Sequence, residues 1–294
     1  MINNLVKKMC LGTAQFGLNY GIANRGGRVS KVEAFKILES ASRRGINTLD
    51  TAYAYGQSEN IVGKFRMRNN NNLKIISKLP GINKFDKLRV EDLFYTSLSR
   101  LKISKIYGYL IHEFDDFLKY ENIWGILEKL KKQGLIQKIG FSLYRPEELK
   151  TIIKNKVNFD IIQFPYSIFD RRFDRYLNVL KEKGIEVHAR SLFLQGLVFL
   201  RPAGLPKKLI KAKVFIKKLH RIAAQEAISI DALCLNFALL NPSVDKVIFG
   251  VDNLAQLETN IRDINMVARV KNIYHKLKKL SIGDERILLP NGWN

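Results

Sequence analysis

The sequence predicts a single parallel α/β barrel of eight strands. Short apolar runs typical of buried strands alternate with longer segments in which apolar residues recur every three or four positions. This alternation favours parallel strands, each joined to the next by a helix. The length of 294 residues suits one large barrel or two small domains, and no Pro/Ser-rich or low-complexity linker divides the chain. We therefore expect one domain over residues 1–294.

Eight strands are expected in chain order, several of them ending in a polar residue just before a loop. In a parallel barrel the carboxyl ends of the strands, and the loops after them, carry the chemistry. The expected strands are Met9–Thr13, Ile46–Asp50, Leu73–Ser77, Ile106–Ile111, Lys138–Ser142, Phe159–Phe164, Ile185–Ala189 and Val244–Val251.

The helices between the strands are predicted from capping signals and apolar spacing. Ser30 and Glu33 have the spacing of a capping box, and Gly45 ends the helix that follows. Pro146 stands near the start of a later helix, where its missing N–H is harmless. Core-facing positions are expected at Ala34, Ile37, Leu38 and Ala41, at Ile61, Val62 and Phe65, at Phe94, Leu98 and Leu101, and at Ile123, Leu127 and Leu130. Further expectations are a loop at Thr13–Asn24, a solvated turn at Asn69–Asn72, a connection at Leu192–Pro206, helices at Lys207–Glu226, Asp231–Leu240 and Leu254–Asp263, and a tail to Trp293 across one end.

The composition narrows the class of protein. The formal net charge is +23, yet the lysines are dispersed over helix faces without interleaved aromatic residues, which favours solvated surfaces and attraction of anionic ligands over nucleic-acid binding. No apolar run is long enough to span a membrane, and the N-terminus lacks a signal-peptide core. Cys10 and Cys234 have no metal or redox spacing, so we expect buried free thiols, a cytoplasmic location and no bound metal.

Four polar residues are expected at or just after successive strand ends. Asp50 ends the second strand, Lys78 follows the third, His112 follows the fourth, and Tyr55 stands on the loop after Asp50. A phenol with a pKa near ~10 is a poor acid at neutral pH unless a cation lowers that pKa, and Lys78 held by Asp50 would serve. Taken singly, each residue has a structural explanation. Asp50 could cap a helix and Tyr55 could anchor a loop, while Lys78 could be a surface charge and His112 a core histidine. Together they favour catalysis.

These four residues, in this order, resemble the catalytic tetrad of the aldo-keto reductase family. The resemblance runs from about Met9 to the C-terminus. It implies reduction of an aldehyde or ketone with NAD(P)H, with Tyr55 as proton donor and His112 bonded to the substrate oxygen. The matching segments are Gly12-Thr13-Ala14-Gln15-Phe16-Gly17, Asp50-Thr51-Ala52, Tyr55-Gly56, Ile76-Ser77-Lys78, Leu110-Ile111-His112, Ile139-Gly140-Phe141-Ser142, Gln163-Phe164-Pro165-Tyr166-Ser167 and Gln195-Gly196-Leu197.

The resemblance also implies how the cofactor, NADP(H) or NAD(H), is held. No G-x-G-x-x-G follows a strand, so there is no Rossmann fingerprint; the family instead lays an extended nicotinamide nucleotide across the strand ends. The implied contacts are Ser142 and Gln163 for the carboxamide, Arg190 for the nicotinamide ring, Ser191, Gln195 and Gly196 for the pyrophosphate, Gly250, Gln256 and Asn260 for the adenosine, and Gly12 and Thr13 after the first strand.

Several positions depart from the family pattern. Leu143 replaces an asparagine, Thr259 replaces the commoner glutamate, and 251–253 lacks a cation for a 2′-phosphate, so we expect only modest discrimination for NADPH over NADH. Arg190 replaces a tyrosine that stacks on the nicotinamide. Its planar guanidinium either stacks in the same place or turns aside to pair with a carboxylate, Asp170 or Asp174.

The sequence is also compatible with two other functions. One is reversible oxidation of a sugar hydroxyl in carbohydrate or glycan metabolism. The other is a regulatory barrel that binds the nucleotide and barely turns over, against which the intact tetrad argues. For either enzyme we expect a small-molecule carbonyl or sugar substrate, no nucleic-acid or membrane partner, and a monomer or weak homodimer.

Overall fold

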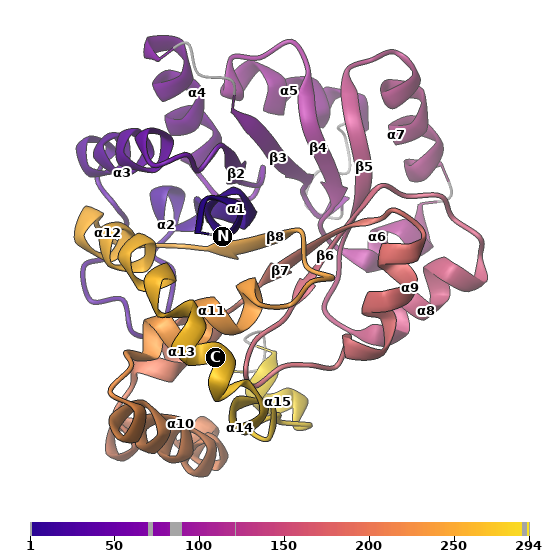
Figure 1. Cartoon of the computed structure of the whole chain (residues 1–294). Coiled ribbons are helices and arrows are strands. Elements are labelled where there is room, and N and C mark those ends of the chain that lie inside the picture. The colour runs from indigo at the N-terminus through magenta and orange to yellow at the C-terminus, as the bar shows by residue number, and fades with distance from the viewer. Residues whose placement is uncertain (1, 70–72, 83–89, 121, 290–292, 294) are drawn as a thin grey trace.

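Eight parallel strands close into a barrel surrounded by helices, as the computed structural model shows (Figure 1). The structure describes residues 2–69, 73–82, 90–120, 122–289 and 293. The strands are hydrogen-bonded in sequence order, and β1 pairs with β8 to close the barrel. Their bounds are β1 Met9–Gly12, β2 Thr48–Asp50, β3 Lys74–Leu79, β4 Ile106–Ile111, β5 Ile136–Ser142, β6 Ile161–Pro165, β7 Glu186–Arg190 and β8 Lys246–Phe249. The predicted single barrel is confirmed, and the alternative of two small domains is wrong.

The helices pack outside the barrel through the apolar faces that the sequence predicts. All four positions expected to face the core in the first predicted helix, now α3, are buried, as are the three in α7. The helix bounds are α1 Ile2–Lys8, α2 Ala14–Gly17, α3 Lys31–Arg43, α4 Ser58–Arg68, α5 Val90–Leu101, α6 Phe114–Lys119, α7 Ile123–Lys132, α8 Pro146–Lys154, α9 Leu177–Glu182, α10 Lys213–Glu226, α11 Ile230–Leu239, α12 Leu254–Asp263, α13 Val267–Asn272, α14 Tyr274–Lys278 and α15 Glu285–Leu288.

Some boundaries differ from the expectation. The segment expected as one helix from Lys207 begins instead as a 3-10 helix, Lys207–Ala212, and only then continues as α10. The loop expected after β1 contains the short helix α2. Helices α1, α6 and α9 are not predicted from the sequence, because six or seven residues are too few to show the helical spacing of apolar residues twice. Of the asparagine turn only Asn69 lies within the described residues, and of the last five residues only Trp293 does.

The capping box of α3 is half formed. Ser30 Oγ accepts a hydrogen bond from the backbone N–H of Glu33 at 3.2 Å, as predicted. The Glu33 carboxylate does not return to Ser30; its Oε1 accepts instead from the backbone N–H of Leu254, at 2.8 Å. The reciprocal half of the prediction is therefore wrong, because Glu33 caps the first turn of α12, 221 residues away.

The amino-terminal end of the barrel is covered by α1 and filled by polar side chains. Lys8 Nζ donates to the backbone oxygens of Leu239 and Asn241, at 3.0 and 2.8 Å, which ties α1 to the end of α11. Inside, Glu186 at the start of β7 contacts His188 Nε2 at 2.7 Å and accepts from the Tyr107 hydroxyl at 2.6 Å. His188 therefore has a structural partner.

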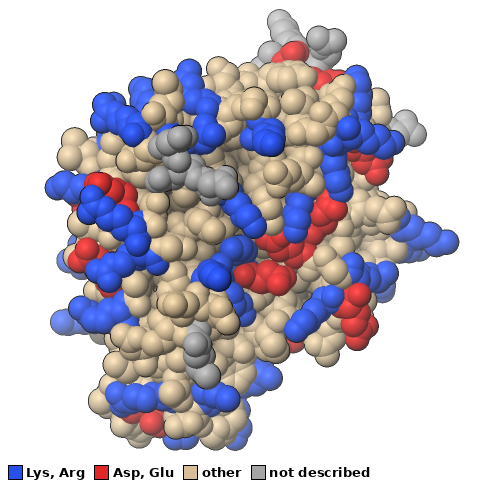
Figure 2. Space-filling view, turned by 45° about the horizontal axis from the view of Figure 1, so that its top comes forward, with Lys and Arg blue, Asp and Glu red and all other residues tan. Residues whose placement is uncertain are grey.

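The surface carries its lysines and arginines in scattered groups. On the face shown in Figure 2 they are spread over several helices, with acidic side chains between some of them. Cys10 and Cys234 are both free and buried, as predicted. Within the described residues, no one helix combines the length and apolarity needed to cross a bilayer; Lys207–Glu226 and Ile230–Leu239 meet that requirement only as a pair, bent by 96°.

A candidate active site at the carboxyl ends of the strands

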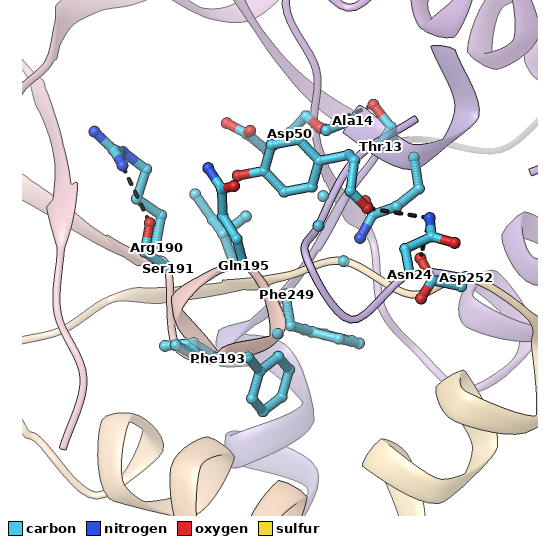
Figure 3. A pocket seen from close by; sticks show the side chains of 18 of the residues that line it. Thr13, Ala14, Asn24, Asp50, Arg190, Ser191, Phe193, Gln195, Phe249 and Asp252 are labelled. Atoms are coloured by element: carbon cyan, nitrogen blue, oxygen red, sulfur yellow. Dashed lines mark hydrogen bonds between the residues drawn. The ribbon is translucent and has the colours of Figure 1, made fainter. Parts of the chain in front are cut away.

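A cavity of about 740 Å³ opens at the carboxyl ends of the strands (Figure 3). Its walls come from the loops after β1, β2, β4, β5, β7 and β8 and from the first turns of α11 and α12. Lys78 and Gln163 are buried beneath it and do not line it. The other predicted site residues all line it: Gly12, Thr13, Asp50, Tyr55, His112, Ser142, Arg190, Ser191, Gln195, Gly196, Gly250, Gln256 and Asn260.

A buried ion pair lies under the cavity. Lys78 Nζ donates to both carboxylate oxygens of Asp50, at 2.9 and 2.7 Å, and to the backbone oxygen of Thr51 at 2.9 Å. The Lys78 side chain is 0% exposed and that of Asp50 is 5% exposed. Gln163 Nε2 also donates to Asp50 Oδ1, at 2.8 Å. The amide nitrogen of Gln163 therefore points to the ion pair. Of the two residues expected to contact the nicotinamide carboxamide, Ser142 and Gln163, only Ser142 lines the cavity.

Tyr55 is fixed by close backbone packing between α2 and the loop after β2. A Cβ atom added to Gly17 would lie 1.6 Å from the Tyr55 backbone oxygen, so no side chain fits at residue 17. Next along the chain, Gly56 has a φ of +53°, in the left-handed region that glycine adopts without strain. Ser58, at the start of α4, anchors the loop because its Oγ donates to Thr13 at 2.7–2.9 Å.

The side chains of the four predicted catalytic residues meet at this point. Lys78 Nζ lies 5.2 Å from the centre of the Tyr55 ring. The rings of Tyr55 and His112 stand edge to face, with centres 5.9 Å apart and planes at 80°. The structure thus brings together a phenol, an imidazole and a buried carboxylate–lysine pair from the ends of three neighbouring strands, β2, β3 and β4.

The electrostatics of Tyr55 differ from the expectation. Burial raises the pKa of the Tyr55 phenol well above its ordinary value, the Asp50 carboxylate raises it further, and Arg190 opposes both. The predicted lowering by Lys78 is wrong as a net direction. The main physical reason is burial, which disfavours the charged phenolate; in addition, the Asp50 carboxylate compensates the Lys78 charge at 2.7 Å, so the pair presents little net charge to the phenol.

Arg190 remains at the cavity. Its Cζ lies 4.2 Å from the centre of the Tyr144 ring, and its guanidinium donates to the Leu143 backbone oxygen at 2.8 Å and to Ser191 Oγ at 3.2 Å. The alternative in which Arg190 pairs with a carboxylate is wrong. Asp170 is paired with Arg172, and Asp174 with Arg171.

The loop after β1 contributes wall residues that the sequence patterns do not single out. Tyr20 lines the cavity and hydrogen-bonds to the side chain of Gln195, whose backbone oxygen accepts from Ile22 N at 2.9 Å. Asn24 lines the cavity farther along the same loop. The sequence does place these residues in a loop after a strand end, where a site is expected. Without a motif, that position does not predict which side chain of the loop lines the cavity.

The cavity has features that suit a bound nicotinamide nucleotide. Its volume is within the range of about 300–1,000 Å³ that small-molecule sites occupy. Two buried polar atoms of its wall residues, Arg190 Nε and Asn260 Oδ1, have no hydrogen-bond partner among the described residues. Buried polar groups are normally paired, so both atoms are candidates to bond a ligand. Arg190 would meet a ring beside Tyr55, and Asn260 would meet a donor at the other end.

The fold and the site define a barrel enzyme with its chemistry at the strand ends, and comparison with known proteins specifies its family. Residues 8–280 match the family model for the Aldo/keto reductase family, so the chain belongs to this family. It is therefore an NAD(P)-dependent oxidoreductase.

Individual relatives cover most of the chain. An uncharacterized oxidoreductase of Bacillus subtilis, YqkF, is 28% identical over 285 residues, which cover 88% of this chain and 92% of that protein. L-galactose dehydrogenase of Arabidopsis thaliana is 27% identical over 256 residues, 80% of this chain and 79% of that protein. Among solved structures, the holo form of aldo-keto reductase AKR11C1 from Bacillus halodurans superposes with a TM-score of 0.73, at 24% identity and with 95% of both chains covered. That likeness shows the fold.

Proposed function

We propose that the protein reduces an aldehyde or ketone of a small molecule to the alcohol, with NAD(P)H as reductant and Tyr55 as proton donor. The observation that carries the proposal is the meeting of Tyr55 and His112, edge to face at 5.9 Å, above the buried Lys78–Asp50 pair. Both rings line the same cavity, so a carbonyl oxygen between them would contact both.

The reduced nicotinamide, when bound, supplies the hydride. The protein's own residues supply the proton and orient the carbonyl oxygen that receives it. The Tyr55 phenol, whose pKa burial raises, holds its proton at neutral pH and can give it to the carbonyl oxygen as negative charge develops there. His112 orients that oxygen. Lys78, paired with Asp50, fixes the floor of the site with its Nζ 5.2 Å from the centre of the Tyr55 ring.

Replacing Tyr55 with phenylalanine tests the assignment. Tyr55→Phe removes the proton donor and should lower kcat by on the order of 10²–10⁴ while leaving the dissociation constant of the cofactor nearly unchanged. Tyr95→Phe, at an exposed tyrosine on α5, is the matched control and should keep wild-type turnover. If Tyr55→Phe retains most of the activity, another group donates the proton.

A second candidate is oxidation of a sugar hydroxyl, favoured by the likeness to L-galactose dehydrogenase over 80% of the chain. The same residues would act in reverse, with Tyr55 accepting the hydroxyl proton. Comparing steady-state rates for a panel of aldehydes with reduced cofactor and for a panel of sugars with oxidised cofactor decides between the two. Negligible turnover in both directions, with nucleotide still bound, would instead indicate a regulatory barrel. The two buried free thiols suit a reducing, cytoplasmic compartment, and we propose a monomer or weak dimer there.

A further inference from the structure

Carboxylates line both ends of the cavity, including Glu113 beside His112, but among the residues that the structure describes a cation lies at only one end. Arg190 is the one lysine or arginine among the described residues that line it, and it lies beside Tyr144. Asp231 and Asp252 line the opposite end. Figure 3 shows Arg190 and Asp252 on opposite sides of the cavity, with the loop that carries Gln195 between them.

The proposed function fixes which part of the nucleotide reaches which end. The nicotinamide must lie beside Tyr55 for hydride and proton to reach one carbonyl group. A dinucleotide is elongated, so its adenosine half must extend along the cavity past Gln195 toward Asp252 and Asn260. The adenosine ribose, where NADH carries a 2′-hydroxyl and NADPH a 2′-phosphate, therefore meets the acidic end.

Asp252 is held in a fixed place at this end. Its Oδ1 accepts a hydrogen bond from Asn24 Nδ2 at 3.3 Å, and its backbone N–H donates to Gln256 Oε1 at 2.7 Å. Asn24 is itself anchored, because Nδ2 also donates to the backbone oxygens of Tyr20 and Gly27, at 3.1 and 3.0 Å. The carboxylate therefore cannot swing away from a ligand without breaking the link between two loops.

The neighbouring helix terminus is already occupied by acceptors. The N-terminus of a helix normally attracts a phosphate through its free N–H groups. In α12 the N–H of Leu254 donates to Glu33 Oε1 at 2.8 Å, and the N–H of Gln256 donates to Asn253 Oδ1 at 2.9 Å. Two N–H groups of this terminus are thus already bonded, one of them to a second carboxylate that lies behind the cavity wall.

The cations nearest in sequence do not line the cavity, although Lys36 forms an exposed ion pair with Glu33. Lys246 donates to the backbone oxygen of Lys7 at the amino-terminal end of β8, away from the site. Arg262 is exposed and does not itself line the cavity, but its Nη2 donates at 3.3 Å to Oγ1 of Thr259, a wall residue. Lys36 is exposed and lies 3.9 Å from Glu33.

We propose that Asp252, with Glu33 behind it, makes the enzyme select NADH over NADPH. A 2′-hydroxyl can donate a hydrogen bond to the Asp252 carboxylate, whereas a 2′-phosphate is repelled by it. The inference rests on the proposed nicotinamide-dependent reduction, and it names the form of the cofactor.

Dissociation constants test the inference without turnover. Binding of NADH and of NADPH to the full-length protein is measured by titration calorimetry at pH 8, because burial raises the pKa of Asp252 above its ordinary value. Wild type should bind NADH at least about tenfold more tightly, a difference of roughly 1.4 kcal/mol. Asp252→Asn should narrow that ratio about tenfold by strengthening NADPH binding. Glu113→Gln removes a carboxylate at the His112 end of the same cavity and should leave the ratio unchanged.

The outcomes separate this inference from the proposed function. Wild type binding NADPH as tightly as NADH, or more tightly, overturns the inference, as does an Asp252→Asn ratio equal to that of wild type. If NADPH is preferred and Arg262→Ala removes the preference, Arg262 is the selecting residue and the inference is wrong. If neither nucleotide binds, the proposed function falls together with it.

Discussion

Removing either member of the buried ion pair should shift the acidity of Tyr55, and the two removals should act in opposite directions. In wild type the Asp50 carboxylate compensates the Lys78 ammonium at 2.7 Å. Lys78→Met leaves the carboxylate uncompensated, which raises the pKa of the Tyr55 phenol further. Asp50→Asn leaves the ammonium uncompensated, which lowers that pKa. The sequence alone suggests that both changes act in the same direction, because it places Lys78 beside the hydroxyl and treats Asp50 only as its support.

The size of the effect follows from the distance. Lys78 Nζ lies 5.2 Å from the centre of the Tyr55 ring. Coulomb's law with an effective dielectric constant of ~20 gives about 3 kcal/mol for a phenolate and an uncompensated ammonium at that distance. Because 1.36 kcal/mol corresponds to a tenfold change, the ionisation constant of the phenol should rise on the order of a hundredfold in Asp50→Asn.

The pH dependence of kcat/KM for carbonyl reduction measures this change. The protonated phenol is the active form, so activity is present below its pKa and is lost as the pH rises through it. The alkaline limb should move to lower pH in Asp50→Asn and to higher pH in Lys78→Met. Thermal unfolding of both variants shows whether the barrel is intact. Limbs that move in the same direction, or not at all in folded variants, would refute the compensation argument.

Two further predictions concern Arg190 and Glu59. Arg190→Tyr removes the positive charge beside the nicotinamide site, so the ratio of oxidised to reduced cofactor dissociation constants, expected above one in wild type, should fall roughly tenfold, about 1.4 kcal/mol; an unchanged ratio in calorimetry contradicts this. Glu59 is fully buried, accepts from Ser77 Oγ at 2.6 Å, and has a pKa raised by burial above its ordinary 4.5. The folded state therefore binds more protons than the unfolded state above pH 4.5, and stability falls with rising pH. The free energy of unfolding, measured with denaturant at pH 5 and 7.5, should therefore fall less between these two pH values in Glu59→Gln than in wild type. An equal fall in both proteins means that Glu59 does not contribute.

The barrel and the meeting of the four catalytic candidates could be predicted because both follow from local periodicity. Apolar spacing marks the strands and helices, and parallel strands that close in sequence order bring their carboxyl ends together. Asp50, Lys78 and His112 then converge whatever the helices in between contain. The buried faces of α3 and α7 agree with the prediction for the same reason, since each depends on residues within three turns.

The rest of the site depends on pairs of residues that no local pattern connects. Glu33 has the spacing of a capping box, yet its carboxylate bonds to Leu254, 221 residues away. Asn24 bonds to Asp252 across 228 residues. In both cases the sequence shows a polar residue in a loop or a first turn, but its partner depends on how closing β1 against β8 places their loops.

Arg190, which replaces the family's tyrosine, affects the pKa of Tyr55 because the Lys78–Asp50 pair beneath it carries little net charge. Because Asp50 compensates Lys78, the cation whose charge lowers the pKa of Tyr55 is Arg190, and it lowers the pKa of Tyr20 as well. This charge is positioned by the protein itself, 4.2 Å from the centre of the Tyr144 ring and with bonds to Leu143 and Ser191. In the proposed reaction this charge counteracts the rise in the pKa of Tyr55 that burial causes. It also disfavours the binding of a cationic oxidised ring. We therefore predict that the arginine favours reduction in two ways: it lowers the pKa of the phenol, which makes it a better acid, and it weakens the binding of the oxidised cofactor, which eases its release.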